Sequence, residues 1–119
     1  MNRISNKQEE WANDIKLRMQ ILRNAFMVKC KNLEDAEVQK VLNKVEQILI
    51  NGSTNYIIDE YKSLTDEALV KLFDMSDYKF CKLFIMLFST KNAIYEFTQK
   101  QRLENQKKLD IIKQKYANI

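Results

Sequence analysis

Apolar residues recur three and four positions apart over the first quarter of the chain, which is the spacing of a helix with one buried face. Ser5 followed by Gln8 predicts a capping box at the start of this helix, because each side chain satisfies a backbone N–H group of the other residue. No residue that breaks a helix follows before about Cys30. We therefore expect a long amphipathic helix whose apolar positions are Trp11, Ile15, Met19, Leu22 and Phe26.

A second apolar pattern predicts a helix that ends at the single glycine of the chain. Asn32 and, three residues later, Asp35 mark its expected start, since both residue types cap helix N-termini. Asn51 and Gly52 mark its expected end, with the glycine in the left-handed conformation that closes many helices. The apolar positions between these signals are Val38, Val41, Leu42, Val45, Ile48 and Leu49.

Hydroxyl residues predict the starts of three shorter helices in the middle of the chain. Ser53 or Thr54 is expected to cap the first, Thr65 the second and Ser76 the third. The third is apolar on nearly all sides over 80–88. We expect it either to be central in the core or to form part of a surface for a partner.

The last helix is expected over 91–116, with a polar middle that is solvated or projects from the body. Apolar residues return at its end, at Leu109, Ile112 and Tyr116. The expected core of the whole chain is led by Trp11, Ile15, Leu22, Phe26, Val38, Leu42, Val45, Leu49, Phe80, Phe84 and Leu87.

The composition favours the same all-helical fold. The 119 residues include one Gly and no Pro, so tight turns that need a positive or a fixed φ are scarce. Sandwiches and barrels need many such turns. We expect one domain, 1–119, which is an all-α bundle of five or six helices with a long first and a long last helix.

Charge is distributed unevenly, although the net charge is only +4. Residues 1–31 carry seven Lys and Arg against three acids, residues 32–95 carry seven against ten, and residues 96–119 carry six against three. The two ends are therefore basic and the middle is acidic. This pattern predicts either contacts between the ends and the middle or a basic face built from the two terminal helices.

Residue types on which many enzymes depend are scarce. The chain has no His, which excludes a Ser–His or Cys–His relay, and one Gly excludes a phosphate-binding glycine loop. Neighbouring acids diverge by about 100° on a helix, so they complement a helix start better than they share a ligand. We expect a protein that is not an enzyme and has no cofactor or metal. The alternative left open is a magnesium-dependent nuclease built from Asp59, Glu60 and Asp66.

Neither cysteine belongs to a metal-binding pattern. Cys30 and Cys81 lie in amphipathic or apolar segments, where we expect buried, reduced thiols. A disulfide needs Cα atoms within about 7 Å, which a sequence does not show. The first ten residues are polar, and the longest apolar run, 83–88, is far shorter than the roughly 20 residues of a membrane span. We expect a cytoplasmic protein without membrane contact.

The segment TDEALVKLFDMSDYKFCKL, residues 65–83, resembles a helix-turn-helix motif. The resemblance places the turn at 74–76 and makes Phe80 a buried position of the second helix. Asp74 stands where such motifs usually have a glycine. If the motif reads DNA, the second helix would present Tyr78, Lys79 and Lys82 to the major groove.

The opening segment KQEEWANDIK, residues 7–16, resembles the first helix of small phage and mobile-element proteins. This resemblance implies a mobile-element context and, by itself, no activity. Small helical proteins of that context often work by stoichiometric binding, as anti-CRISPR inhibitors, inhibitors of host enzymes and transcriptional regulators do.

The sequence therefore favours a small binding protein, an inhibitor or regulator of the anti-CRISPR type that occludes a host protein or a nucleoprotein complex. The alternative is a helix-turn-helix regulator that binds DNA as a homodimer on a palindrome. The expected contacts to a partner or to nucleic acid are Tyr78, Lys79, Lys82, Lys100, Arg102, Lys107, Lys108, Lys113 and Lys115.

Overall fold

The computed structural model describes residues 5–89 and 106–117. Every regular element in these two stretches is a helix, which confirms the all-α class. The expected last helix is helical from 106 onward, and its earlier part, 91–105, lies outside the described residues. In chain order the helices are α1 (Asn6–Lys29), α2 (Ala36–Asn51), α3 (Thr54–Tyr61), α4 (Asp66–Phe73), α5 (Asp77–Ser89) and α7 (Gln106–Tyr116).

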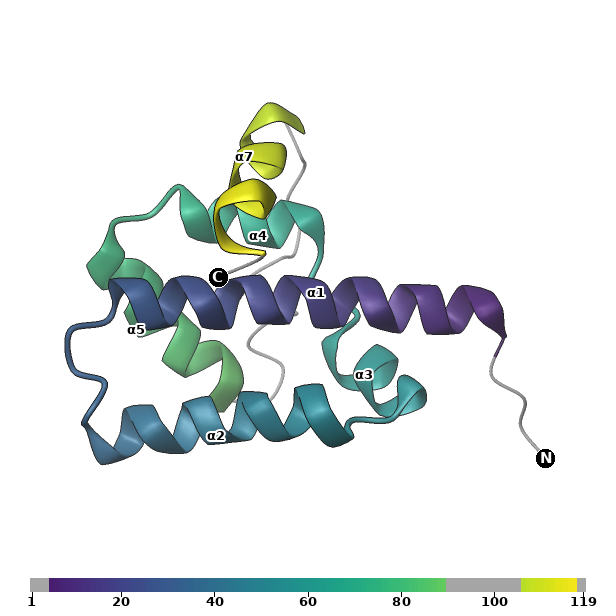
Figure 1. The fold of residues 1–119 in the computed structure, drawn as a ribbon, viewed down its shortest axis with the longest axis horizontal. Coiled ribbons are helices and arrows are strands. Elements are labelled where there is room, and N and C mark those ends of the chain that lie inside the picture. Colours follow the sequence, from purple (N-terminus) through teal and green to yellow (C-terminus); the bar gives the residue numbers. More distant parts are fainter. Residues whose placement is uncertain (1–4, 90–105, 118–119) are drawn as a thin grey trace.

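The longest helix, α1, is the centre of the fold (Figure 1). Each of the other described helices packs against it. On one side of α1 lie α2 and α3, on the other lie α4 and α7, and α5 passes behind α1 toward α2 (Figure 1). The central position that the apolar segment 80–88 suggested therefore belongs to α1, while α5 buries one face and leaves the other exposed.

Side-chain caps fix the helix starts. The hydroxyl of Ser5 accepts a hydrogen bond from the Gln8 N–H at 3.1 Å, and Oε1 of Gln8 accepts one from the Ser5 N–H at 2.9 Å, so the capping box is confirmed. Ser53, Thr65 and Ser76 each accept from the backbone N–H three residues later. These caps are local interactions, which is why the sequence pattern identifies them.

The start of α2 differs from the expectation. Asp35, and not Asn32, is the cap: its Oδ1 accepts hydrogen bonds from the N–H groups of Glu37 and Val38 at 2.9 Å and 3.3 Å. The Asn32 carbonyl instead accepts from the Asp35 N–H at 3.0 Å, in a turn that precedes the helix. The connection between α1 and α2 is therefore longer than expected.

Gly52 ends α2 as expected, but the left-handed conformation is wrong. Its φ of −66° and ψ of 124° are extended angles that any residue adopts. A Cβ atom there would lie 2.5 Å from the carbonyl oxygen of Ile48 and 2.9 Å from Cδ1 of Ile57. The Ile48 carbonyl of α2, together with the Ile57 side chain of α3, therefore leaves space only for glycine.

The core forms where the helices meet α1. Among the expected core positions, Ile15, Leu22, Phe26, Val38, Leu42, Val45, Phe80, Phe84 and Leu87 are buried. The expectation for Trp11 is wrong, since its side chain is 44% exposed near the start of α1, where that helix extends beyond the bundle (Figure 1). Leu49 is only partly buried at the edge of the core.

Four ion pairs tie the basic ends of the chain to its acidic middle. In each pair the cation belongs to α1 or α7, and the carboxylate lies within 46–77. The contacts between the ends and the middle that the charge pattern predicts are therefore present. The pairs are Arg18–Asp66 at 2.7 Å, Arg23–Glu46 at 3.2 Å, Lys29–Asp77 at 2.8 Å and Lys108–Asp74 at 3.2 Å.

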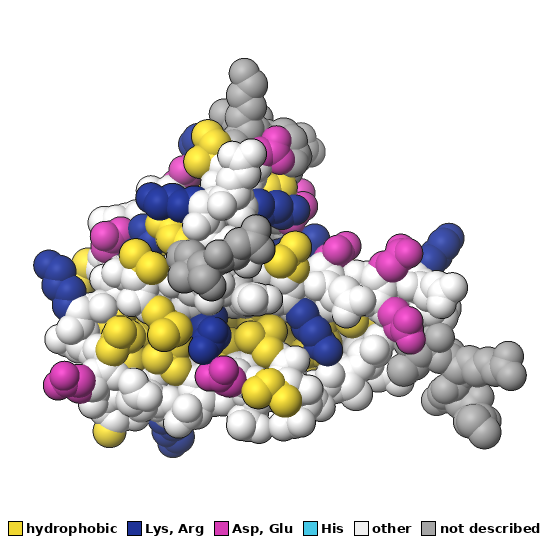
Figure 2. Space-filling model, in the orientation of Figure 1, with side chains coloured by type: hydrophobic (Ala, Val, Ile, Leu, Met, Phe, Trp, Pro, Cys, Tyr) yellow, Lys and Arg dark blue, Asp and Glu magenta, His cyan; other side chains and the backbone are white. Residues whose placement is uncertain are grey.

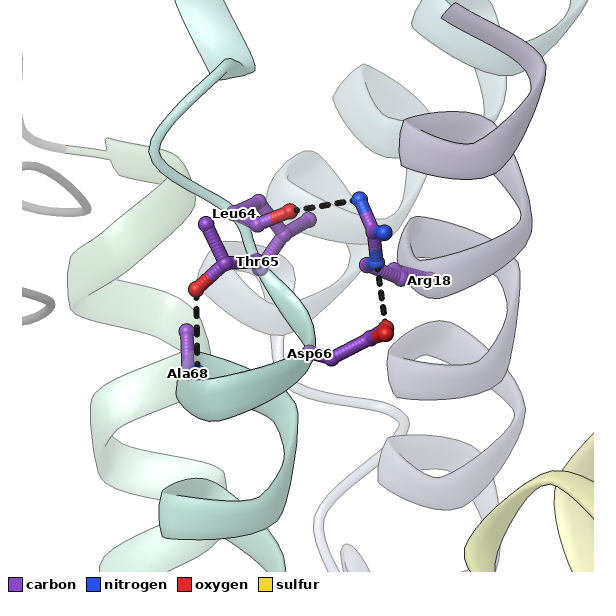
Figure 3. A network of polar contacts seen from close by, with 5 residues as sticks. All are labelled: Arg18, Leu64, Thr65, Asp66 and Ala68. Atoms are coloured by element: carbon purple, nitrogen blue, oxygen red, sulfur yellow. Dashed lines mark hydrogen bonds and ion pairs between the residues drawn. The ribbon is translucent and has the colours of Figure 1, made fainter. Parts of the chain in front are cut away.

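The pair of Arg18 and Asp66 closes the junction between α1 and α4 (Figure 3). Nε of Arg18 donates to Oδ1 of Asp66 at 2.7 Å, and Nη1 donates to the Leu64 carbonyl at 3.2 Å. In the same turn, the Thr65 hydroxyl accepts from the Ala68 N–H at 3.3 Å. One guanidinium group thus holds both the chain that enters α4 and the first residue of that helix.

Candidate functional site

Four helices meet at the ammonium group of Lys29, the last residue of α1. Its Nζ donates to Oδ1 of Asp77, the first residue of α5, at 2.8 Å. The same Nζ lies 5.9 Å, 5.5 Å and 6.0 Å from the ring centroids of Phe73, Phe80 and Tyr116. Aromatic faces attract a cation at these distances. Lys29 therefore joins α1 to α4, α5 and α7 through one charged group.

The charges around Asp77 shift two pKa values. Burial lowers the pKa of Lys29, but the hydrogen bond to Asp77, aided by the charges of nearby groups, raises it above its usual 10.5 overall. The hydrogen bond from Lys29 and the charge of Lys29 lower the pKa of Asp77 below 3.8, and Lys115 and Lys31 lower it further. Positive charge from three segments of the chain therefore converges on one carboxylate.

Helix α7 is fixed at this junction by two polar contacts. Asn24, the one buried polar side chain among the described residues, donates from Nδ2 to the carbonyl of Tyr116 at 3.0 Å. At the other end of α7, Nζ of Lys108 lies 3.2 Å from Oδ1 of Asp74. The ring of Tyr116 also packs on Phe73, with centroids 5.0 Å apart. The basic residues of α7 are therefore held at the ends of α1 and α4.

Two hollows adjoin at Lys29, because its side chain lines both of them. The larger hollow, of about 560 Å³, lies between the end of α1, the start of α2 and α5. The smaller hollow, of about 290 Å³, lies between the end of α1, α4 and α7. We define the basic face as the five lysines that line these hollows: Lys29, Lys31, Lys82, Lys108 and Lys115.

The basic face keeps an excess of positive charge. Figure 2 shows Lys and Arg side chains on both sides of α7, with acidic side chains next to them. Asp74 and Asp77, which line the hollows, are bonded to Lys108 and Lys29. Five lysines against two carboxylates leave three positive charges on this part of the surface.

Four of the contact residues expected from the sequence lie on the hollows. Tyr78 and Lys82 line the larger hollow, and Lys108 and Lys115 line the smaller one. The side chain of Tyr78 is 76% exposed. The structure therefore brings together residues of α5 and α7 that are about thirty positions apart in the sequence.

The other expected contact residues do not join this group. Lys79 is exposed on α5 outside both hollows, and Lys113 is half-buried on α7. Lys107 belongs to α7, but its side chain lies outside the described residues. Lys100 and Arg102 lie outside the described residues altogether.

Two members of the basic face, Lys29 and Lys31, are absent from the set expected from the sequence. Both lie at the end of α1, where a helix pattern shows only a polar position. The signal that points to them is the uneven charge, because an excess of cations in 1–31 requires acids elsewhere in the fold. That signal predicts a contact between segments without saying which residues make it.

The proposed turn of the helix-turn-helix motif, residues 74–76, does join two helices, α4 and α5. Phe80 is buried, as the motif requires, while Tyr78, Lys79 and Lys82 are exposed. The acids at both ends of this turn are bonded to lysines, as described above. The arrangement leaves one face of α5 open to a partner.

The three carboxylates considered for a nuclease do not converge on a metal site. Asp59 and Glu60 are exposed on α3, and Asp66 is bound to Arg18. Among the residues that the structure describes, no group of three His, Cys, Asp or Glu side chains could hold a metal ion. Within the same residues, no helix combines the length and the apolar character of a membrane span.

A scan against family models, a search of curated proteins and a search of solved structures each found no match to this chain.

Proposed function

We propose that this chain is a non-enzymatic binding protein that uses its basic face to cover an anionic surface of a protein or nucleoprotein complex. An inhibitor or regulator carried by a phage or another mobile element is the setting that the opening segment suggests. The observation that carries the proposal is the convergence of five lysines from α1, α5, α7 and the segment after α1 around two adjoining hollows.

Three of these lysines are available to a partner. Lys31, Lys82 and Lys115 are exposed, whereas Lys29 and Lys108 are engaged with Asp77 and Asp74. Like charges that lie close together repel each other, so their proximity lowers stability unless an anion lies between them. A partner with carboxylates or phosphates at this position would relieve that repulsion on binding.

Exposed and half-buried apolar side chains beside the lysines add a means of selecting the partner. Tyr78 and Ile85 line the larger hollow, and Ile111, which is 63% exposed, lines the smaller one. Aromatic and apolar residues at the centre of an interface supply much of the binding energy, while rim charges mainly set the association rate and the salt dependence. The basic face combines lysine charges with such apolar side chains.

A charge-reversal series tests the proposal. The variant K31E/K82E/K115E changes the three available lysines, and K7E/K40E/K62E changes three exposed lysines of α1, α2 and the end of α3 by the same net charge. Each protein is used to capture partners from a lysate of the bacterial host, and captured proteins and nucleic acids are quantified. We expect the wild type and K7E/K40E/K62E to retain the same partner and K31E/K82E/K115E to lose it.

Equal capture by all three proteins, or loss in both variants alike, would contradict a role for this particular face. Circular dichroism of each variant shows whether the helices are intact, so that misfolding is separated from loss of binding. If no partner is captured by the wild type, the proposal fails in this host.

A second candidate is DNA binding by α5, and one observation favours it. Tyr78, Lys79 and Lys82 are exposed together at the start of the helix that follows the turn. Binding to labelled duplex DNA should then weaken steeply with salt and differ between sequences. Lys79 separates the two candidates, because it lies outside both hollows. K79A should weaken DNA binding if α5 enters the groove, and should leave partner capture unchanged if the basic face is the site.

A further inference from the structure

The floor of the larger hollow contains both cysteines of the chain. Cys30 caps the C-terminal end of α1, and Cys81 lies one turn into α5. Both are half-buried free thiols that line the same hollow. Two thiols that are fifty-one residues apart in the sequence thus lie side by side.

Along α5, contacts on either side of Cys81 hold α1 and α5 together. Phe26, one turn before Cys30, stacks on Phe84, one turn after Cys81, with centroids 4.3 Å apart. On the other side, Nζ of Lys29 lies 2.8 Å from Oδ1 of Asp77. Cys81 lies between these contacts along α5, Cys30 follows Lys29 directly in the chain, and both cysteines line the same hollow. The two thiols therefore lie where the two helices meet.

The surroundings make the two thiols unequal. Burial, and then the neighbouring Cys30, raise the pKa of Cys81 to about 11. Cys81 is therefore a protonated thiol at neutral pH. Cys30 is flanked along the chain by Lys29 and Lys31, which both line the hollow. Because both sulfurs line an open hollow with a basic rim, a small anionic oxidant has access to them.

We propose that Cys30 and Cys81 are a site of reversible oxidation, at which a small anionic disulfide of the glutathione type converts the two thiols into an intramolecular disulfide. The inference is independent of the partner proposed above.

The exchange proceeds in two balanced steps. The thiolate of Cys30 attacks one sulfur of the oxidant, forming a mixed disulfide and releasing one glutathione thiolate, which takes up the proton lost by Cys30. The Cys81 thiol then loses its proton to solvent and attacks the Cys30 sulfur, which forms the Cys30–Cys81 bond and releases the second glutathione. In total the protein loses two hydrogens, and one oxidised glutathione becomes two reduced molecules.

Closing this bond should stabilise the fold, because it links α1 to α5 across a long stretch of chain. A loop of that length restricts the unfolded chain considerably, and we expect the melting temperature to rise by roughly 10 °C. Reduction with dithiothreitol should reverse the rise.

The test is incubation of the full chain with oxidised glutathione, followed by acid quenching and intact mass measurement. The expected wild-type product is a monomer that is lighter by two hydrogens and has no free thiol after unfolding. The matched variants C30S and C81S each lack one of the two thiols. C81S should accumulate a stable glutathione adduct on Cys30, and C30S should react much more slowly.

Several outcomes would overturn the proposal. These are two thiols that stay free in the wild type, two stable glutathione adducts on one chain, and disulfide-linked dimers as the main product. Because these three outcomes are all masses of wild-type products, they decide the question even if a variant fails to fold.

Discussion

Two ion pairs on α1 are built alike and differ in what surrounds them. Arg18 binds Asp66 and Lys29 binds Asp77, and each aspartate is the first residue of its helix. The two cations are eleven residues apart in the sequence, as are the two aspartates. Eleven residues make about three turns of an α-helix. Both cations therefore lie on one side of α1 and hold the starts of two successive helices.

The difference between the pairs is their access to solvent. The side chains of Arg18 and Asp66 are 17% and 29% exposed, and the guanidinium also binds a backbone carbonyl. The Lys29 side chain is no more exposed, at 16%, but the side chain of Asp77 is 68% exposed, and both residues line the larger hollow. The two pairs therefore differ in the exposure of the carboxylate. The same contact thus closes one junction of the fold and leaves the other open. The carboxylate of the open junction is the more accessible of the two.

Breaking the closed pair should have the largest effect on stability. Arg18→Met leaves the half-buried carboxylate of Asp66 and the Leu64 carbonyl without their donor, and we expect a loss of about 2 kcal/mol of unfolding free energy. Urea denaturation of wild type and variant measures it. Arg18→Lys is the control, since a lysine keeps the charge but cannot bind both acceptors in the same fork. A loss smaller than that of Lys29→Met would contradict the comparison.

Breaking the open pair should have a smaller effect. Lys29→Met keeps an apolar chain among Phe73, Phe80 and Tyr116 and removes only the charge and its hydrogen bond. We expect a loss of about 1 kcal/mol, mostly from the cation–aromatic contacts. The measurement is again urea denaturation. Lys31→Met removes a neighbouring charge that no aromatic ring contacts among the described residues, and it should leave the midpoint nearly unchanged.

The pH dependence of the open pair should be weak but of defined sign. The lowered pKa of Asp77 means that its stabilising contribution is present above the ordinary value of 3.8 and is lost as the pH falls through the lowered value. The raised pKa of Lys29 means that its contribution is present below 10.5 and is lost as the pH rises through the raised value. The difference in urea midpoint between wild type and Asp77→Asn should therefore be constant around neutral pH and vanish in strong acid. A difference that grows in acid would contradict this assignment.

The helix boundaries were largely predictable from the sequence, because caps and apolar spacing act within a few residues. Thr65 and Ser76 identify the starts of α4 and α5, and both caps are present. The exposure of the Trp11 side chain could not be predicted from such local signals. Its position on the apolar face of α1 is clear, but whether other helices cover that turn depends on the tertiary arrangement. The position of Gly52 at a helix end was also predicted correctly, but the reason was not. The residue is needed for lack of space and not for a left-handed conformation.

The candidate site was predictable only in part, because it joins segments from distant parts of the chain. Lys82 and Lys115 stand out as exposed basic residues of two expected helices. Nothing in either helix pattern shows that Lys29 lies between them or that Cys30 faces Cys81. Such contacts depend on how α1, α5 and α7 cross. The uneven charge along the sequence predicts that distant segments meet, but not which residues do.

The smallest effect on stability is expected at the open rim, and it should come with a large effect on binding. Lys82→Glu changes an exposed side chain of the larger hollow, so the unfolding free energy should stay within about 0.5 kcal/mol of the wild type. The same reversal places a carboxylate beside the anionic partner and should weaken capture more than Lys40→Glu, which alters an exposed lysine of α2 outside the hollows. A variant at the closed junction, Arg18→Lys, should show the opposite behaviour, with reduced stability and undiminished capture of the partner under conditions where it is folded. If Lys82→Glu and Arg18→Lys instead reduce capture in proportion to their loss of stability, binding follows the folded fraction alone, and the open junction has no role that the closed one lacks.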